Sequence, residues 1–175
     1  MKKPKTITPE MLTTLTTKLP EPYKTIVQFA AESGLRISDI LKLRVHHVAD
    51  RCMSVQEAKT KKFKRFDISD SLFVALRALC ALKHDKDYIF NGKQFRTRRK
   101  PLNRSTVHRR IAKLVPGSAH SFRKLYAMNV FKTTGDIFAV QERLNHKYLS
   151  TTCTYLDIDI NKLIKIAAEE VKSNS

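Results

Sequence analysis

Two stretches, HSFRKLYA at residues 120–127 and LNHKYLSTTCTY at residues 144–155, hold the most informative residues of this chain. In the first, His120 and Arg123 are three residues apart, so they share one face of a helix. In the second, His146 follows a helical run, and Tyr155 comes nine residues later, behind a Ser-Thr-Thr segment. A guanidinium, two imidazoles and a phenol therefore occur within one segment of the chain.

Two stretches nearer the N-terminus add further candidates. SGLRISDIL at residues 33–41 contains Arg36 and Asp39, again three apart, so the carboxylate can orient the guanidinium. An isolated pair of this kind is usually a surface ion pair. AKTKK at residues 58–62 lies between two expected strands, and Lys59 is its first lysine. Taken alone, that stretch is typical of a solvated basic hairpin.

Together these residues resemble the catalytic domain of the tyrosine recombinases, the phage-integrase and Xer-type family. The family pattern is an arginine in a G-L-R-x-S-[DE] helix, a lysine in a β-hairpin, H-x-x-R, a histidine or tryptophan after L-G, and a nucleophilic tyrosine. The resemblance covers residues 7–171 in family order. Asn145 replaces the family glycine, and asparagine is the other residue that best tolerates a left-handed conformation after a helix. The catalytic residues that the resemblance implies, with Asp39 in support, are Arg36, Lys59, His120, Arg123, His146 and Tyr155.

Cleavage of a DNA phosphodiester explains why these residue types occur together. The five-coordinate transition state carries negative charge on its non-bridging oxygens, which the guanidiniums of Arg36 and Arg123 would stabilise, with His146 as a further donor. A phenol titrates near ~10, so the attacking tyrosine needs a base. The resemblance gives that role to His120 and makes the hairpin lysine the proton donor to the leaving 5′-oxygen. The product would be a 3′-phosphotyrosine, and neither a metal nor another cofactor is expected.

Two of these assignments leave alternatives open. Tyr148 is close to His146 in sequence, although the T-T-x-x-Y spacing favours Tyr155 as the nucleophile. Several basic residues follow Lys59 in the hairpin, so Lys61 or Lys62 is the reserve candidate for the hairpin lysine.

The charge balance indicates a polyanionic partner. The 175 residues include 34 Lys and Arg against 16 Asp and Glu, a formal net charge of +18. Such an excess raises affinity for nucleic acid and speeds encounter with it, although ribosomal and chromatin proteins share the property. We expect double-stranded DNA to be the partner. The expected DNA-contacting residues are Lys61, Lys62, Lys64, Arg65, Arg96, Arg98, Arg99, Arg104, Arg109 and Arg110.

Apolar periodicity predicts a mainly helical α+β domain with a small three-stranded antiparallel sheet. Thr8-Pro9-Glu10 is a typical helix start, and Gly34 is a typical end for the second helix. The period changes between Val45 and Ser69, where three short strands are expected at 47–49, 52–56 and 62–68. Helices are expected at 9–18, 21–33, 35–43, 70–83, 105–114, 118–134, 136–144, 150–156 and 159–171.

The domain organisation follows from the resemblance. We expect residues 1–6 to be a basic linker or arm and residues 7–175 to be the catalytic domain, without the N-terminal core-binding domain that most family members carry. The three cysteines are scattered and predict neither a disulfide framework nor a zinc site. Neither a signal peptide nor a membrane-spanning run is apparent, so a cytoplasmic, nucleoid-associated or host-intracellular location is expected.

The predicted function is site-specific DNA recombination, as integration, excision or inversion. A full reaction joins two DNA sites, so we expect a homotetramer on DNA, a monomer in the free state, and accessory DNA-bending proteins as further partners. The enzymatic alternatives are a type IB topoisomerase and a telomere-resolvase-like strand transferase. The alternative from another class is a non-catalytic basic DNA-binding protein, which predicts the loss of at least one charged catalytic position.

Overall fold

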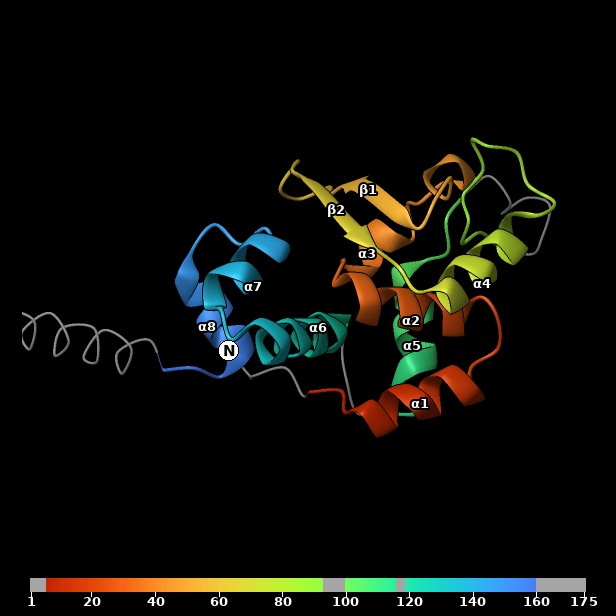
Figure 1. Cartoon of the computed structure of the whole chain (residues 1–175). Coiled ribbons are helices and arrows are strands. Elements are labelled where there is room, and N and C mark those ends of the chain that lie inside the picture. The colour runs from red at the N-terminus through yellow and green to blue at the C-terminus, as the bar shows by residue number, and fades with distance from the viewer. Residues whose placement is uncertain (1–5, 93–99, 116–118, 160–175) are drawn as a thin grey trace, which may run out of the picture. The chain divides into compact units, whose positions relative to one another are not determined.

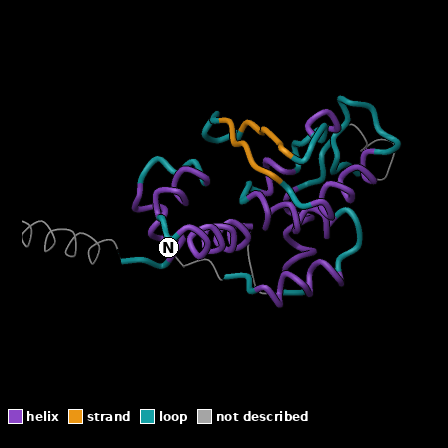
Figure 2. Tube along the Cα trace, in the orientation of Figure 1, coloured by secondary structure: helices purple, strands orange, loops and turns teal. Residues whose placement is uncertain are grey.

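The computed structural model describes residues 6–92, 100–115 and 119–159. The chain divides into two compact units, Met1–Tyr126 and Ala127–Ser175, which are considered separately below (Figure 1). The boundary lies within one helix, so unit 1 contains its first half and unit 2 its second half. As predicted, the described residues are mainly helical, with one small antiparallel sheet (Figure 2).

Unit 1 contains most of the secondary structure. Its first helix starts as the sequence predicts, since the Thr8 hydroxyl accepts a hydrogen bond from the Met11 backbone N–H at 3.2 Å and Pro9 takes the first helical position. The elements of unit 1, in order, are α1 (Pro9–Lys18), α2 (Tyr23–Ser33), α3 (Ile37–Ile40), η1 (Val45–His47), β1 (Cys52–Gln56), β2 (Phe63–Asp67), α4 (Asp70–Cys80), α5 (Arg104–Ala112) and the start of α6 (Ala119–Thr134).

The core of unit 1 forms around α2. This helix contacts α1, α3 and α4, and it lies between α1 and α4 (Figure 1). Ile26, Phe29 and Ala30 are fully buried, which matches a helix covered by neighbours on several sides. Gly34 ends it with a φ of +62°, the left-handed conformation predicted for that residue. A Cβ atom on Gly34 would lie 2.4 Å from the Tyr126 ring, so packing as well as backbone conformation requires glycine here.

The sheet has two strands where three were predicted. β1 and β2 pair antiparallel, with Met53 opposite Phe66 and Val55 opposite Lys64 on the buried face. The expected third strand at 47–49 is wrong, because residues 45–47 form the 3-10 helix η1. Within the expected strand, the His47 and Val48 N–H groups donate to the Arg44 and Val45 carbonyls at 3.0 and 2.9 Å, so they do not join a sheet. The strand prediction rested on side-chain pattern alone, and these local hydrogen bonds of a helical turn were not apparent from it.

Unit 2 is built from the end of α6 and two short helices, α7 (Ile137–Arg143) and α8 (Leu149–Leu156). Gly135, with a φ of +67°, ends α6 as predicted. The Asp136 carboxylate caps α7 by accepting from the Phe138 N–H at 2.7 Å. α7 and α8 contact each other, with Val140 and Cys153 buried. Apart from Asp159, the C-terminal helix predicted at 159–171 lies outside the described residues.

Candidate active site

Two arginines of unit 1 meet at one buried carboxylate. The Nη1 atoms of Arg36 and Arg123 lie 2.9 and 3.2 Å from the same oxygen, Oε1 of Glu57. Glu57 is fully buried, and the Arg123 side chain is 1% exposed. Arg36 is 23% exposed, so this guanidinium reaches the surface while its partners do not. The structure thus brings together two of the predicted catalytic residues.

Both guanidiniums are positioned by the turn at Gly34. Arg36 follows that turn in an extended conformation, with φ −69° and ψ 141°, and precedes α3 instead of lying within a helix from 35 to 43. Arg123 comes from the second turn of α6, and its Nη1 also donates to the Gly34 carbonyl at 2.7 Å. The carbonyl groups at the end of α2 lack helical partners, and a cation there is favoured by the helix dipole.

Asp39 forms the longer of two ion pairs that Arg36 makes with buried carboxylates. Its Oδ2 atom is 3.8 Å from Arg36 Nη1, a longer separation than the one to Glu57. Its Oδ1 atom instead accepts a hydrogen bond from the Ala58 N–H at 3.3 Å, at the start of the β1–β2 turn. Asp39 therefore supports the turn as well as Arg36, and Glu57 is the nearer of the two carboxylates to Arg36.

Glu57 was missed because its partners are distant in sequence, 21 residues away for Arg36 and 66 for Arg123. One local signal could have found it. Met53 and Val55 point to the buried face of β1, and continuing the alternation places residue 57 on that face as well. A carboxylate at such a position needs buried cations as partners.

His120 completes a small pocket with the two arginines. The pocket is about 50 Å³ and is lined by Arg36, Ile37, Ser38, Arg104, His120 and Arg123. Partial burial lowers the pKa of His120 below its ordinary value of 6.5, and the positive charge of Arg104 lowers that pKa further. Arg123, Arg36 and Lys59 act in the same direction. A neutral imidazole at pH 7 can accept a proton, which is what a general base must do.

Lys59 lies in the turn between β1 and β2 and is exposed. Its positive charge contributes, after those of the three arginines, to the lowered pKa of His120. Lys61 and Lys62 are also exposed, and Lys61 has a φ of +59°. The choice among these lysines as proton donor stays a prediction, with Lys59 the first candidate.

The prediction that Lys64 contacts DNA is wrong, because this side chain is buried. Its side chain is 5% exposed, its Nζ donates to the Ser33 carbonyl, and the ammonium lies 4.6 Å from the Tyr126 ring centroid. The strand alternation turns it inward, opposite Val55, and the end of α2 provides an acceptor. Lys64 therefore neutralises the carbonyl end of a helix and cannot reach a phosphate from this position.

Unit 2 brings His146 and Tyr155 together. Their ring centroids are 5.1 Å apart, and His146 Nδ1 is 3.0 Å from the Thr152 hydroxyl. Asn145 has a φ of +51°, which confirms that asparagine adopts the left-handed turn before His146. Tyr148 is 61% exposed and lies at the start of α8, beside Lys147. The contact with His146 favours Tyr155 over Tyr148 as the functional phenol.

The remaining predicted DNA contacts stay predictions. Arg65, Arg104, Arg109 and Arg110 are exposed, as a phosphate contact requires. Arg65 donates to the Cys52 sulfur at 3.0 Å, and Arg110 lies 5.5 Å from the Tyr23 ring centroid. Arg96, Arg98 and Arg99 lie outside the described residues.

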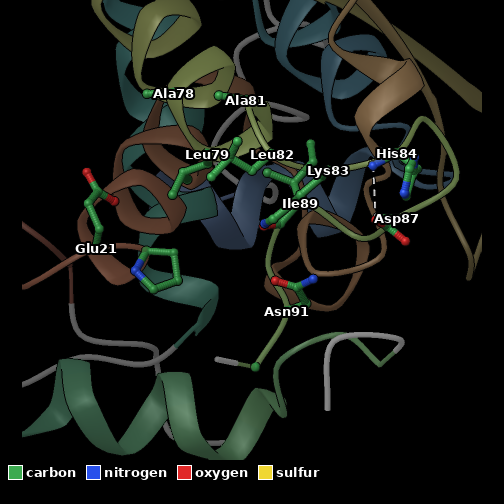
Figure 3. Close-up of a pocket in the computed structure, with 12 residues that line it drawn as sticks. Glu21, Ala78, Leu79, Ala81, Leu82, Lys83, His84, Asp87, Ile89 and Asn91 are labelled. Carbon is green, nitrogen blue, oxygen red and sulfur yellow. Dashed lines mark hydrogen bonds between the residues drawn. The ribbon is translucent and has the colours of Figure 1, made fainter. Parts of the chain in front are cut away.

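A larger pocket of about 540 Å³ lies elsewhere in unit 1. Figure 3 shows Leu79, from the end of α4, and Leu82, which follows that helix, with Ile89 and Asn91 along the pocket. It shares no lining residue with the small pocket and contains none of the predicted site residues.

Over the described ranges, no group of three or more His, Cys, Asp or Glu side chains is arranged to hold a metal ion. Over the same ranges, none of the helices is long and apolar enough to cross a membrane.

Comparison with known proteins places this chain in a family. The family model for the phage integrase family matches residues 5–162. The probable integrase/recombinase YoeC of Bacillus subtilis (strain 168) is 33% identical over 138 residues, covering 75% of this chain and 75% of that protein. The tyrosine recombinase XerC of Mesorhizobium japonicum is 34% identical over 148 residues, covering 77% of this chain and 46% of that protein. The chain thus spans about half the length of this second relative.

Solved structures share the fold. The crystal structure of XerA recombinase matches with a TM-score of 0.73 and 20% identity, over 97% of this chain and 66% of that one. The XerH site-specific recombinase bound to its palindromic difH substrate, in a post-cleavage complex, matches with a TM-score of 0.66 and 19% identity, over 95% and 53% of the two chains. Because the family match covers most of the sequence and a curated integrase/recombinase aligns over three quarters of both chains, this chain belongs to the phage integrase family.

Proposed function

We propose that this protein cleaves and rejoins double-stranded DNA at specific sites through a 3′-phosphotyrosine on Tyr155. The observation that carries the proposal is the pair of guanidiniums, from Arg36 and Arg123, fixed on one buried carboxylate beside His120. Fixed donors are what stabilise charge developing on a phosphoryl group, because they need no reorganisation during the reaction. The DNA complex of the related XerH recombinase supports DNA as the partner.

In the proposed reaction the Tyr155 hydroxyl attacks phosphorus while its proton passes to the neutral imidazole of His120. The bond from phosphorus to the 5′-oxygen breaks, and Lys59 donates a proton to that oxygen. The guanidiniums and His146 stabilise the negative charge on the non-bridging oxygens. The products are a 3′-phosphotyrosine and a free 5′-hydroxyl. Attack by another 5′-hydroxyl reverses the step and rejoins the strand without an external energy source.

Strand exchange between two DNA sites requires four cleaved strands. We therefore propose a homotetramer on DNA, with one tyrosine for each strand, and a monomer in the free state. Accessory DNA-bending proteins would bring distant sites together. The target site, and the choice among integration, excision and inversion, would follow from the DNA sequences that the protein recognises.

Covalent trapping tests the proposal. Purified protein would be incubated with nicked duplexes drawn from the DNA flanking its gene, and the products run on a denaturing gel. A nick close to the cleavage site releases a short fragment and so blocks rejoining. We expect an adduct with a free 5′-hydroxyl on the departing fragment, reduced about 10²–10³-fold in Arg36→Gln, the range seen when a fixed oxyanion donor is removed. Specific binding by a folded protein without any adduct would instead support a basic DNA-binding protein.

A second measurement separates recombination from topoisomerase activity. A recombinase exchanges strands between two matching sites, whereas a type IB topoisomerase relaxes supercoiled plasmid with no requirement for a second site. We expect joined products only when both duplexes carry the site that gives the adduct. Relaxation of plasmids that lack the site would favour the topoisomerase.

A further inference from the structure

Glu57 contacts three parts of the proposed site. Its Oε1 accepts from Arg36 at 2.9 Å and from Arg123 at 3.2 Å. Its Oε2 accepts from the Thr60 hydroxyl at 2.9 Å, within the turn that carries Lys59. The carboxylate therefore contacts both guanidiniums that are proposed to bind the phosphate. It also contacts the turn whose lysine is proposed to protonate the leaving oxygen.

The main chain of Glu57 strengthens the link to the turn. Its N–H donates to the Lys62 carbonyl at 3.0 Å, and its carbonyl accepts from the Lys61 N–H at 2.9 Å. The turn between these bonds is further held by the hydrogen bond from Ala58 to Asp39. The turn is thus fixed to residue 57 at both ends by main-chain bonds and at Thr60 by the carboxylate.

Burial makes this carboxylate hard to replace. Glu57 and Arg123 are excluded from solvent, and a buried ion needs an opposite charge and hydrogen bonds to offset the loss of hydration. Three guanidiniums, from Arg36, Arg123 and Arg104, lie near the two carboxylates of Glu57 and Asp39, and the net positive charge suits an anionic ligand. In the described part of the chain, Arg36 meets carboxylates through Nη1 only, so its Nε and Nη2 remain available to a phosphate.

We propose that Glu57 is a positioning residue, which holds the Arg36 and Arg123 guanidiniums and, through Thr60, the Lys59 turn in one arrangement around the scissile phosphate. This inference rests on the proposed function and adds a residue to it. Glu57 does not touch the substrate, and its effect on the reaction passes through the three cations.

Single-turnover cleavage of a nicked duplex tests the positioning role. Glu57→Gln keeps the volume but removes the charge, and we expect adduct formation about 10- to 100-fold slower, because displacements near 1 Å can cost that much. Glu57→Asp keeps the charge but is one methylene shorter, so it should also be slow. Asp67→Asn is the matched control, since it removes an exposed carboxylate from the same hairpin. Full rates in both Glu57 variants would overturn the proposal.

A sulfur-substituted substrate separates the two effects proposed for Glu57, namely its hold on the guanidiniums through Oε1 and its hold on the Lys59 turn through Oε2. A 5′-bridging sulfur leaves as a thiolate, which needs no proton, so a defect in the Lys59 turn should disappear with that substrate. Thr60→Val removes the hydrogen bond to Glu57 Oε2 and a longer one, at 3.4 Å, from the Lys62 N–H. Both bonds lie within the turn, so the cleavage defect of this variant should vanish with sulfur. The Glu57→Gln defect should shrink but persist, because the guanidiniums remain displaced. Defects of equal size on both substrates would indicate general loss of structure and contradict the inference.

A measurement without DNA keeps this test independent of the proposed reaction. Restricted rotation of the Arg36 guanidinium gives separate NMR signals for its two Nη groups, and the pairing with Glu57 predicts such signals in the wild type. In Glu57→Gln these signals should broaden and merge. Unchanged signals would overturn the positioning role even if the wild type cleaves DNA. Merged signals together with a wild type that forms no adduct would preserve the positioning role and refute the proposed function.

Discussion

Replacement of Gly34 by alanine should destabilise unit 1 by about 2–5 kcal/mol, because two separate penalties add. The first is conformational. Gly34 has a φ of +62°, and the left-handed conformation costs other residues about 1–2 kcal/mol. The second is steric. The new methyl group would lie 2.4 Å from Cδ1 of Tyr126, and overpacking of this kind costs about 1–3 kcal/mol.

The chain provides a matched control for the conformational penalty. Gly135 has a similar φ of +67°, but a Cβ atom there would meet nothing within 4 Å. Gly135→Ala should therefore cost only about 1–2 kcal/mol. Urea unfolding, followed by circular dichroism and fitted by linear extrapolation, measures both free energies of unfolding.

A double-mutant cycle isolates the steric penalty. Tyr126→Leu removes the ring that the alanine methyl would strike, so it should recover about 1–3 kcal/mol of the Gly34→Ala loss as a coupling energy. Equal losses in Gly34→Ala and Gly135→Ala, or a coupling energy near zero, would refute the close packing of Gly34 against Tyr126.

Three further predictions concern single residues. Lys64→Met should cost about 1–3 kcal/mol in urea unfolding, because the buried Ser33 carbonyl loses its donor, and it should leave the salt dependence of DNA binding unchanged. Lys62→Met, at an exposed position, should lower the slope of log binding constant against log salt concentration by about one if Lys62 contacts a phosphate. Equal slopes for the Lys62 and Lys64 variants would contradict the distinction between an exposed and a buried lysine. The His120 pKa of the free protein, followed by NMR, should lie below 6.5 and rise in Arg104→Ala, where a nearby positive charge is lost. A pKa above 6.5 in the wild type would refute the claim that burial and the neighbouring cations lower it. Asn145→Ala should cost about 1–2 kcal/mol in unit 2 because its φ is +51°, whereas Asn145→Gly should cost nothing, and equal losses would show that the turn is not strained.

Local signals in the sequence predicted the ends of elements well. The Thr8-Pro9 start of α1, the left-handed Gly34 and the left-handed Asn145 each depend on the conformation of one or two residues. Such preferences act over a few bonds, so the sequence carries them directly. The helix containing His120 and Arg123 was predicted on other grounds, from apolar residues along one face, and Phe122, Leu125 and Tyr126 on that face are buried.

Partner choice inside the protein was not predictable in the same way. Arg36 was assigned to Asp39 because they are three residues apart, yet the nearer carboxylate is Glu57, from a strand end. Long-range contacts of the hairpin, from Ala58 to Asp39 and from Glu57 to Arg123, bring that carboxylate to both arginines. Lys64 was predicted to be exposed because lysine usually is. Strand alternation instead places it on the buried face, where its ammonium donates to the Ser33 carbonyl at the end of α2.

The central claim is that Tyr155 forms the covalent bond to DNA, and peptide mapping of the trapped adduct tests it most directly. The wild-type adduct would be digested with protease and nuclease, and the phosphorylated tyrosine identified by mass spectrometry, with Tyr155→Phe and Tyr148→Phe run in parallel. We predict a 3′-nucleotide on Tyr155, no adduct in Tyr155→Phe, and an undiminished adduct in Tyr148→Phe. A nucleotide on Tyr148, or an adduct that persists in Tyr155→Phe, would contradict the claim.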